Sequence, residues 1–119
     1  SNNMMKKNFK SEDILIIGTE KIGTIRANIA RKSHSKCKIF IFDTDLKKAE
    51  ELANEVNGIV LKTLNEGLTN KSIHFVVVSV INKFAKKICI EALKSGKNVL
   101  CEKPMGRNAK EAKEIALIC

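Results

Sequence analysis

DILIIGTEKIG, residues 13 to 23, is the stretch that decides the fold this sequence predicts. An apolar run the length of a β-strand fills its first half and stops at Gly18. From Ile22 onward the apolar positions Ile22, Ile25 and Ile29 recur at helical spacing. The stretch therefore predicts a strand, a glycine turn and a helix in direct succession.

The same alternation continues along the chain. Further strand-sized runs are CKIFIF (37–42), IVL (59–61), IHFVVVSV (73–80) and KNVLC (97–101). The helical stripes between them are Leu46, Ala49, Leu52, Ala53 and Val56, then Phe84, Ile88 and Ala92 beside Ala85, Cys89 and Leu93. TLNEGLTN (63–70) predicts a short helical or irregular crossover, Asn57-Gly58 and Ser95-Gly96 are typical helix ends, and NAKEAKEIALIC (108–119) predicts a last helix.

Strands that alternate with helices predict right-handed crossovers and a parallel sheet covered on both faces. The fold class is therefore α/β, a doubly wound Rossmann sheet with strand order 3-2-1-4-5. We expect residues 1–10 to be a tag remnant and flexible N-terminus, because Ser1-Asn2-Asn3 precedes the first methionine. We expect residues 11–119 to form one domain, truncated at its C-terminal end within an amphipathic helix.

Composition narrows the class of partners. The apolar share of 44% and the charged share of 29% are those of an ordinary globular protein. The net charge of +9 makes anionic partners plausible, but the lysines are scattered over every predicted helix, which favours a solvated surface over nucleic-acid binding. No apolar run approaches the roughly 20 residues of a membrane helix, so we expect a cytoplasmic protein without a membrane partner.

Cysteine and histidine give no sign of a metal site. The cysteines Cys37, Cys89, Cys101 and Cys119 are widely separated and include no Cys-x-x-Cys pair. They are expected to be free, small apolar residues in a reducing compartment. We therefore predict no metal.

The turn GTEKIG (18–23) is comparable with the dinucleotide-binding pattern G-x-G-x-x-G. Gly18 permits the tight turn and Gly23 the close packing of helix on strand, whereas Glu20 replaces the middle glycine that lets a pyrophosphate approach. A carboxylate adds bulk and negative charge there, but the side chain is free to turn outward, and the amides at the helix start still favour an anion. The predicted cofactor contacts in this turn are Gly18, Thr19, Glu20, Lys21, Ile22 and Gly23.

Asp43 ends the second predicted strand, where an acid accepts hydrogen bonds from the adenosine ribose and favours NAD over NADP. The alternative is an N-cap role, since Asp43 or Thr44 precedes a helix. Thr44, together with Ser79, Val80 and Asn82 after the fourth strand, completes the predicted contacts at the switch point.

Lys103 follows the fifth strand, beside the position where a nicotinamide and its substrate would lie. A lysine there could hydrogen-bond a substrate hydroxyl or carbonyl and, with its pKa lowered by burial, transfer a proton. Glu102 could balance its charge and Pro104 fixes the bend. The alternative is a surface turn with a solvated Glu-Lys pair.

The segment CIEALKSGKNVLCEKPMGRNAKEAKE (89–114) resembles the Gfo/Idh/MocA family (glucose-fructose oxidoreductase, inositol dehydrogenase and rhizopine catabolism). In that family a run A-L-x-x-G-K-x-V-x-x-E-K-P precedes an alanine- and glutamate-rich helix. DTDLKKAEELANE (43–55) is similar to the family's second strand-helix junction. Where the family usually has T-P-N-x-x-H after strand 4, this chain keeps only Asn82.

The resemblance implies the cofactor-binding domain of an NAD(P)-dependent oxidoreductase that acts on a hydroxyl or carbonyl carbon, most often of a sugar or polyol. It implies NAD, with NADP as the alternative, and a small-molecule substrate held by a second lobe that is absent here, so the chain alone should not turn over. Association of the chain into a homo-oligomer is a further expectation. The implied roles are Lys103 as catalytic lysine, Glu102 and Pro104 as shapers of the nicotinamide pocket, and Gly18, Gly23 and Asp43 as cofactor residues. A non-catalytic Rossmann module that senses a nucleotide or mediates assembly is the alternative function.

Overall fold

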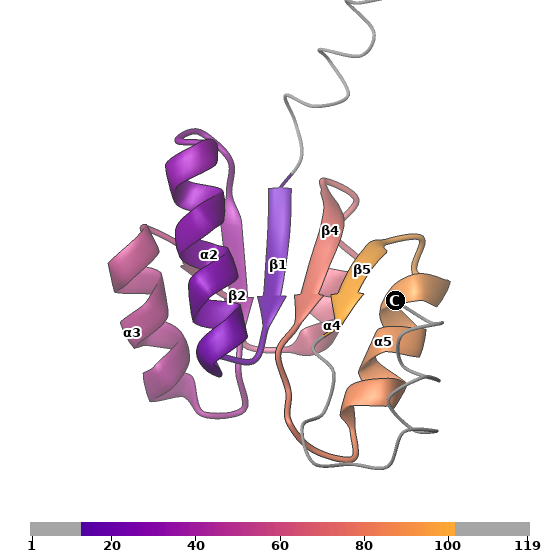
Figure 1. Ribbon diagram of the computed structural model, residues 1–119. Coiled ribbons are helices and arrows are strands. Elements are labelled where there is room, and N and C mark those ends of the chain that lie inside the picture. The colour runs from indigo at the N-terminus through magenta and orange to yellow at the C-terminus, as the bar shows by residue number, and fades with distance from the viewer. Residues whose placement is uncertain (1–12, 102–119) are drawn as a thin grey trace, which may run out of the picture.

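The computed structural model describes residues 13–101, in which strands and helices alternate (Figure 1). In chain order the elements are β1 (Asp13–Ile17), α2 (Lys21–Ser33), β2 (Ile39–Phe42), α3 (Leu46–Val56), β3 (Ile59–Val60), α4 (Leu64–Leu68), β4 (Ile73–Val78), α5 (Ala85–Lys94) and β5 (Asn98–Cys101). Each strand lies within the apolar run that predicted it, and the crossover at 63–70 contains the short helix α4. The predicted alternation is confirmed.

The strands form one parallel sheet in the order β3-β2-β1-β4-β5, which confirms the predicted topology. At the end of β1, Ile17 pairs with Phe42 of β2 on one side and Val78 of β4 on the other. The chain thus moves outward from β1 in one direction and later returns to its other side. The carboxyl ends of β1 and β4 flank the switch point, where ligands of such sheets bind.

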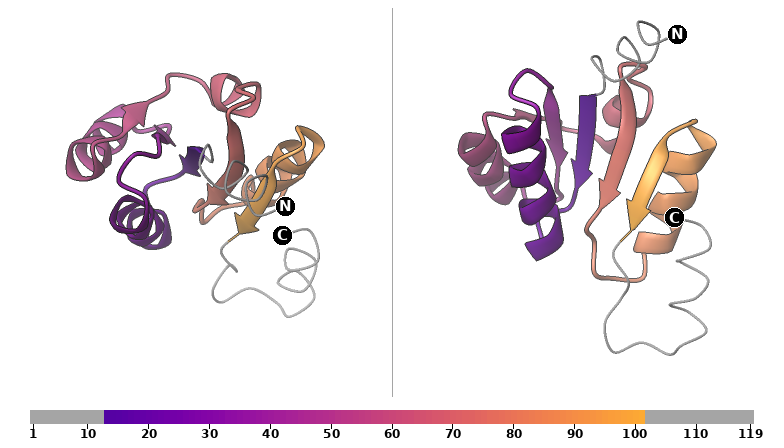
Figure 2. Two further views of the ribbon diagram at one scale, coloured as in Figure 1. Left: turned by 90° about the horizontal axis from the view of Figure 1, so that it is seen from above. Right: turned by 45° about the horizontal axis from the view of Figure 1, so that its top comes forward.

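Helices cover both faces of the sheet, α2 and α3 on one and α4 and α5 on the other (Figure 2). Along β1, Leu15 and Ile17 face the layer of α4 and α5, whereas Ile16 faces the layer of α2 and α3. All three are at most 1% exposed. A strand buried on both faces has to be apolar at consecutive positions, which explains the unbroken run in the sequence.

Helix α2 packs small residues against the sheet. Gly23 and Ala27 are its buried residues, whereas Ile25 and Ile29 are 40% and 48% exposed. A Cβ atom on Gly23 would lie 2.4 Å from the carbonyl oxygen of Gly18. Because the helix lies this close to the turn, branched side chains do not fit on its inner face. The isoleucine spacing located the helix correctly but does not mark its buried face.

Short polar side chains fix the ends of α3. The Asp45 carboxylate accepts a hydrogen bond from the Lys48 N–H at 3.3 Å and caps the N-terminus. Asn57 adopts the left-handed conformation at φ 53°, and the N–H of Gly58 donates back into the helix at 2.8 Å. The prediction that Asn57-Gly58 ends this helix is confirmed.

Arg31, in the last turn of α2, joins this helix to two neighbouring segments. Its Nε donates to the carbonyl of Val56 at 2.7 Å, and its Nη1 donates to the carbonyls of Ser35 and Cys37 at 2.8 Å each. Its Nη2 donates to the carbonyl of Asn57 at 3.2 Å. One planar guanidinium thus satisfies carbonyl groups at the end of α3 and in the turn before β2.

Replacing Arg31 with methionine is expected to lower the free energy of unfolding by about 2 kcal/mol, because partly buried carbonyls lose charged donors. Urea denaturation followed by circular dichroism measures the loss. Arg26→Met is the matched control, since Arg26 is exposed on the same helix, and it should stay within about 0.5 kcal/mol of the parent chain. Equal losses in the two variants would contradict the role given to Arg31.

Strand β5 is joined to α5 by a disulfide bond between Cys101 and Cys89, whose Cα atoms lie 6.9 Å apart. The prediction that the cysteines are free is therefore wrong for this pair. Spacing gave no sign of it, because the two residues meet only when α5 packs back on β5. Cys37 is free and half-buried, and burial raises the pKa of its thiol.

Several predicted features lie outside the described residues: the segment 1–10, Glu102, Lys103, Pro104, Cys119 and the last helix, 108–119. Within residues 13–101, the structure has no helix whose length and apolar character would let it cross a membrane.

Candidate functional site

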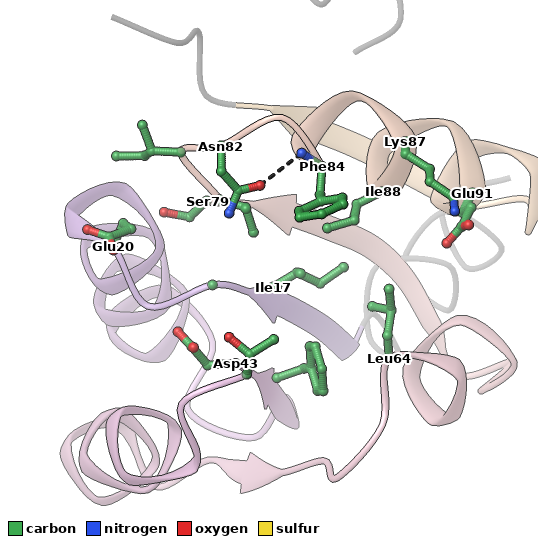
Figure 3. A pocket seen from close by; sticks show the side chains of 15 residues that line it. Ile17, Glu20, Asp43, Leu64, Ser79, Asn82, Phe84, Lys87, Ile88 and Glu91 are labelled. Carbon is green, nitrogen blue, oxygen red and sulfur yellow. Dashed lines mark hydrogen bonds between the residues drawn. The ribbon is translucent and has the colours of Figure 1, made fainter.

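A cavity of about 450 Å³ lies at the carboxyl ends of the central strands (Figure 3). Ile17 ends β1 and Gly18 follows it, Phe42 ends β2 and Asp43 follows it, and the segment 79–82 follows β4. Helices α4 and α5 complete the lining with Leu64, Phe84, Lys87, Ile88 and Glu91. The cavity thus occupies the switch point of the sheet, the position predicted for the ligand.

The glycine turn packs directly against the chain that leaves β4. Gly18 has a φ of +90°, and a Cβ atom there would lie 2.5 Å from the carbonyl oxygen of Ser79. The N–H of Gly23 donates to Ser79 Oγ at 2.8 Å, and Ser79 is only 1% exposed. The tight turn and close packing expected of the two glycines are both present. Together they fix the wall of the cavity at which α2 begins.

Glu20 lies at the edge of the cavity, on the side of the glycine turn (Figure 3). It is exposed and precedes α2 without making a side-chain cap. Because water surrounds an exposed carboxylate, its repulsion of a nearby phosphate is weakened by solvent and salt. Glu20 therefore leaves the helix N-terminus open to an anion.

Three hydrogen bonds fix the carboxylate of Asp43. Its Oδ2 accepts from the N–H and the hydroxyl of Thr19 at 2.9 and 2.7 Å, and its Oδ1 accepts from the N–H of Asp45 at 2.8 Å. Burial raises the pKa of Asp43, but the hydrogen bonds from Asp45 and Thr19 and the charge of Lys48 outweigh burial and hold it below the ordinary value. Asp43 is therefore an ionised acceptor beside the cavity.

The alternative N-cap role of Asp43 or Thr44 is wrong, because Asp45 caps α3. A carboxylate offers about four acceptor positions, of which Asp43 uses three within the protein. At least one acceptor position thus remains for a ligand hydroxyl. Thr44, exposed at the same edge, also lines the cavity.

The chain leaving β4 combines a polar turn with an apolar rim. The Oδ1 atom of Asn82 accepts a hydrogen bond from the N–H of Phe84 at 2.9 Å, drawn as a dashed line in Figure 3. This bond leaves the side-chain amide nitrogen, which donates only, on the cavity side. Ile81 and Phe84 are 60% and 55% exposed, so a large part of the rim is apolar and open to a ligand.

The predicted site residues fall into three groups. Those that line the cavity are Gly18, Glu20, Asp43, Thr44, Ser79, Val80 and Asn82. Those that lie beside it in the glycine turn and at the start of α2, without lining it, are Thr19, Lys21, Ile22 and Gly23. Glu102, Lys103 and Pro104 lie outside the described residues, but β5 ends with Cys101 paired to Val78, so the chain leaves the sheet next to β4.

Sequence reasoning missed the part of the cavity made by α4 and α5. The sequence pattern places Leu64 only in a crossover and Phe84 and Ile88 only in a core-facing stripe, and it gives no sign that Lys87 and Glu91 line a cavity. The position of these residues in the chain could have revealed them, because a helix that follows a strand of a parallel sheet begins at the carboxyl edge, where ligands bind. The four-residue spacings of 84 with 88 and 87 with 91 then place these pairs on neighbouring faces of one helix.

In residues 13–101 there is no group of three histidine, cysteine or acidic side chains placed to bind a metal ion. The side-chain donors at the cavity are instead hydroxyls, an amide group and the Lys87 ammonium, and the acceptors include carboxylates. Such a set suits a polar organic ligand with hydroxyl and phosphate groups.

Known proteins share both sequence and fold with this chain. An uncharacterized oxidoreductase of Streptococcus pneumoniae serotype 4 is 29% identical over 104 residues, which are 87% of this chain and 28% of that protein. GenD2 from gentamicin A biosynthesis, solved in complex with NAD, has a TM-score of 0.74 at 24% identity over 90% of this chain and 31% of its own. The structure of myo-inositol 2-dehydrogenase from Lactobacillus plantarum has a TM-score of 0.70 and is 23% identical in sequence, and the match covers 90% of this chain and 32% of that protein.

The two solved structures, at 24% and 23% sequence identity, show that this chain shares their fold. The chain spans under a third of the length of each of these proteins. A family model described as "Oxidoreductase family, NAD-binding Rossmann fold" matches residues 13–119, nearly the whole chain. The family inferred from the Glu-Lys-Pro run is thereby confirmed: the chain belongs to the Gfo/Idh/MocA oxidoreductases and forms their NAD-binding Rossmann domain.

Proposed function

We propose that the cavity at the switch point binds NAD, and that the chain serves an oxidoreductase acting on a hydroxyl-bearing carbon of a sugar or polyol. The observation that carries this proposal is the Asp43 carboxylate, ionised and held by three hydrogen bonds at the end of β2. An acid at this position accepts hydrogen bonds from the adenosine ribose.

The turn beside Asp43 suits the diphosphate of the same ligand. At both Gly18 and Gly23 an added Cβ atom would collide with backbone, so the turn is tight and α2 begins close to the sheet. The N-terminus of α2 adds the positive end of a helix dipole. Ribose and diphosphate would therefore be bound by neighbouring groups on one edge of the sheet.

Asp43 also supports a preference for NAD. A 2′-phosphate would lie against an ionised carboxylate that hydrogen bonds to Thr19 and Asp45 keep in place. Like charges at this distance repel, and a fixed side chain cannot move away from the phosphate. NADP is accordingly the weaker ligand in this proposal.

Lys103 is proposed as the group that exchanges a proton with the substrate hydroxyl, with Glu102 and Pro104 shaping its surroundings. NAD supplies the hydride acceptor when it is bound. What supports a role for this segment is its connection to Cys101, which pairs with Val78 at the edge of the sheet where the cavity lies. Sugar or polyol substrates are proposed because myo-inositol 2-dehydrogenase shares the fold.

Amide chemical shifts test the site directly. On titration of the ¹⁵N-labelled chain with NAD, the largest shifts are expected at residues 18–23, 43–44 and 79–82. Residues 70–73 and 96–98, at the opposite edge of the sheet, should not move. Shifts confined to that opposite edge would contradict the proposed site.

Activity is tested on the polypeptide read from the complete gene, with sugars and polyols as substrates and NADH absorbance as the readout. Lys103→Met is expected to slow hydride transfer by at least about a hundredfold, because proton transfer by a positioned side chain contributes about that much. A complete gene product that binds NAD but reduces it with none of these substrates would favour the non-catalytic alternative.

A further inference from the structure

The groups at one end of the cavity fix which way a bound dinucleotide must run. In the proposed site, Gly18 and Glu20 border the position of the diphosphate, and Asp43 borders that of the ribose. The adenine base, attached to that ribose, then has to enter the remaining part of the cavity. That part is bounded by the end of β2, the start of α4 and one side of α5.

This remaining part is an apolar slot. Phe42 at the end of β2 lines it. Leu64 lies on one side, and Phe84 and Ile88 lie on the side of α5 (Figure 3). Phe42, Leu64 and Ile88 pack against the core beneath, whereas Phe84 is 55% exposed. An aromatic ring is planar and apolar on both faces, so a purine fits between these side chains with its polar edge pointing along the slot.

Two charged residues stand at the end of the slot that is far from the glycine turn. Lys87 and Glu91 are one helical turn apart on α5, and Figure 3 shows both beside Ile88 and Leu64. Glu91 is half-buried, whereas Lys87 is exposed. The side chain of Glu91 makes no hydrogen bond with another residue of the described range, so its oxygens are available to a ligand.

We infer that Glu91 recognises the base of the dinucleotide by accepting a hydrogen bond from the exocyclic amino group of adenine. This inference rests on the proposed function, because the NAD site sets the direction of the ligand. A carboxylate is acceptor-only when ionised and therefore selects an amino group over a carbonyl oxygen at the same ring position. The chain thus distinguishes adenine from hypoxanthine, in which that position carries a carbonyl.

The test compares NAD with nicotinamide hypoxanthine dinucleotide in calorimetric titrations of the chain. NAD is expected to bind about tenfold more tightly, because the analogue loses a charge-assisted hydrogen bond and turns an oxygen toward the carboxylate. In Glu91→Gln the side-chain amide can donate to the carbonyl, so the preference should fall to about twofold or less. Glu50→Gln, exposed on α3 outside the cavity, should keep the tenfold preference.

Equal affinities of the unmodified chain for the two dinucleotides would overturn the inference and leave the NAD site intact. An unchanged preference in Glu91→Gln would overturn it as well. If neither dinucleotide binds, the proposed function itself fails, and the assignment of Glu91 fails with it.

Discussion

Replacing Gly23 with alanine is expected to lower the free energy of unfolding by about 3 kcal/mol and to abolish detectable NAD binding. In most helices this change stabilises, because alanine has the higher helix propensity. Here the new Cβ atom would lie 2.4 Å from the Gly18 carbonyl oxygen and 2.9 Å from Ser79 Cβ. Neither atom belongs to the far end of a flexible side chain, so α2 has to move away from β4. That movement would break the 2.8 Å hydrogen bond from the Gly23 N–H to Ser79 Oγ.

Gly96→Ala is the control for this variant. Unlike Gly23, Gly96 has a positive φ, of 82°, but no heavy atom lies within 4 Å of the position its Cβ would take. It should cost about 1 kcal/mol from backbone strain alone and leave NAD affinity unchanged. Chemical denaturation and NAD titration of both variants separate the two effects. A Gly23→Ala chain as stable as its parent would show that the close packing of α2 on β4 is not required.

Replacing Asp43 with asparagine is expected to weaken NAD binding by about tenfold and strengthen NADP binding by about tenfold. The loss follows from removing a charged acceptor for the ribose. The gain follows from charge, since a phosphate of about −2 at roughly 5 Å from a carboxylate is repelled by about 1.5 kcal/mol even at the dielectric constant of water. Asp45→Ser is the control, because it removes the same charge two residues away and serine can still cap α3. Its preference between the two cofactors should not change.

The same substitution at position 43 is expected to change how stability depends on pH. All three donors to Asp43 are N–H or O–H groups directed at its two oxygens, so an amide nitrogen faces a donor in either orientation. The pKa of Asp43 is lowered in the folded state, so its ionised form adds stability above the unfolded value of about 4, and this is lost as the pH falls through the folded value. Asp43→Asn should therefore be less stable than the parent at pH 7, by about 1 to 2 kcal/mol. The gap should narrow at pH 3, and a gap of constant size would contradict an ionised Asp43.

The sheet was predictable because its determinants are local. A strand buried on both faces has to be largely apolar at consecutive positions, and the sequence shows such apolar runs at 13–17 and 73–78. Right-handed crossovers then allow few arrangements of five alternating strands and helices. The glycine turn and Asp43 were predictable for the same reason, because each directly follows a strand and therefore lies at the carboxyl edge.

The features that the sequence did not reveal depend on distances between elements. The inner face of α2 consists of Gly23 and Ala27 because that helix approaches the sheet closely, and apolar spacing carries no measure of this approach. The bond between Cys89 and Cys101 depends on how α5 packs back on β5. Glu91 lines the cavity only because one side of α5 and the end of β2 border the same space. Hydrophobic periodicity describes each element alone, and such contacts between elements lie beyond it.

Calorimetric titration of the chain with NAD and with NADP tests the central claim most directly, because it asks whether the switch-point cavity is a cofactor site and whether Asp43 sets its preference. The account predicts one NAD site per chain, with NADP bound at least about tenfold more weakly. The account would be contradicted if neither dinucleotide bound, or if NADP bound as tightly as NAD.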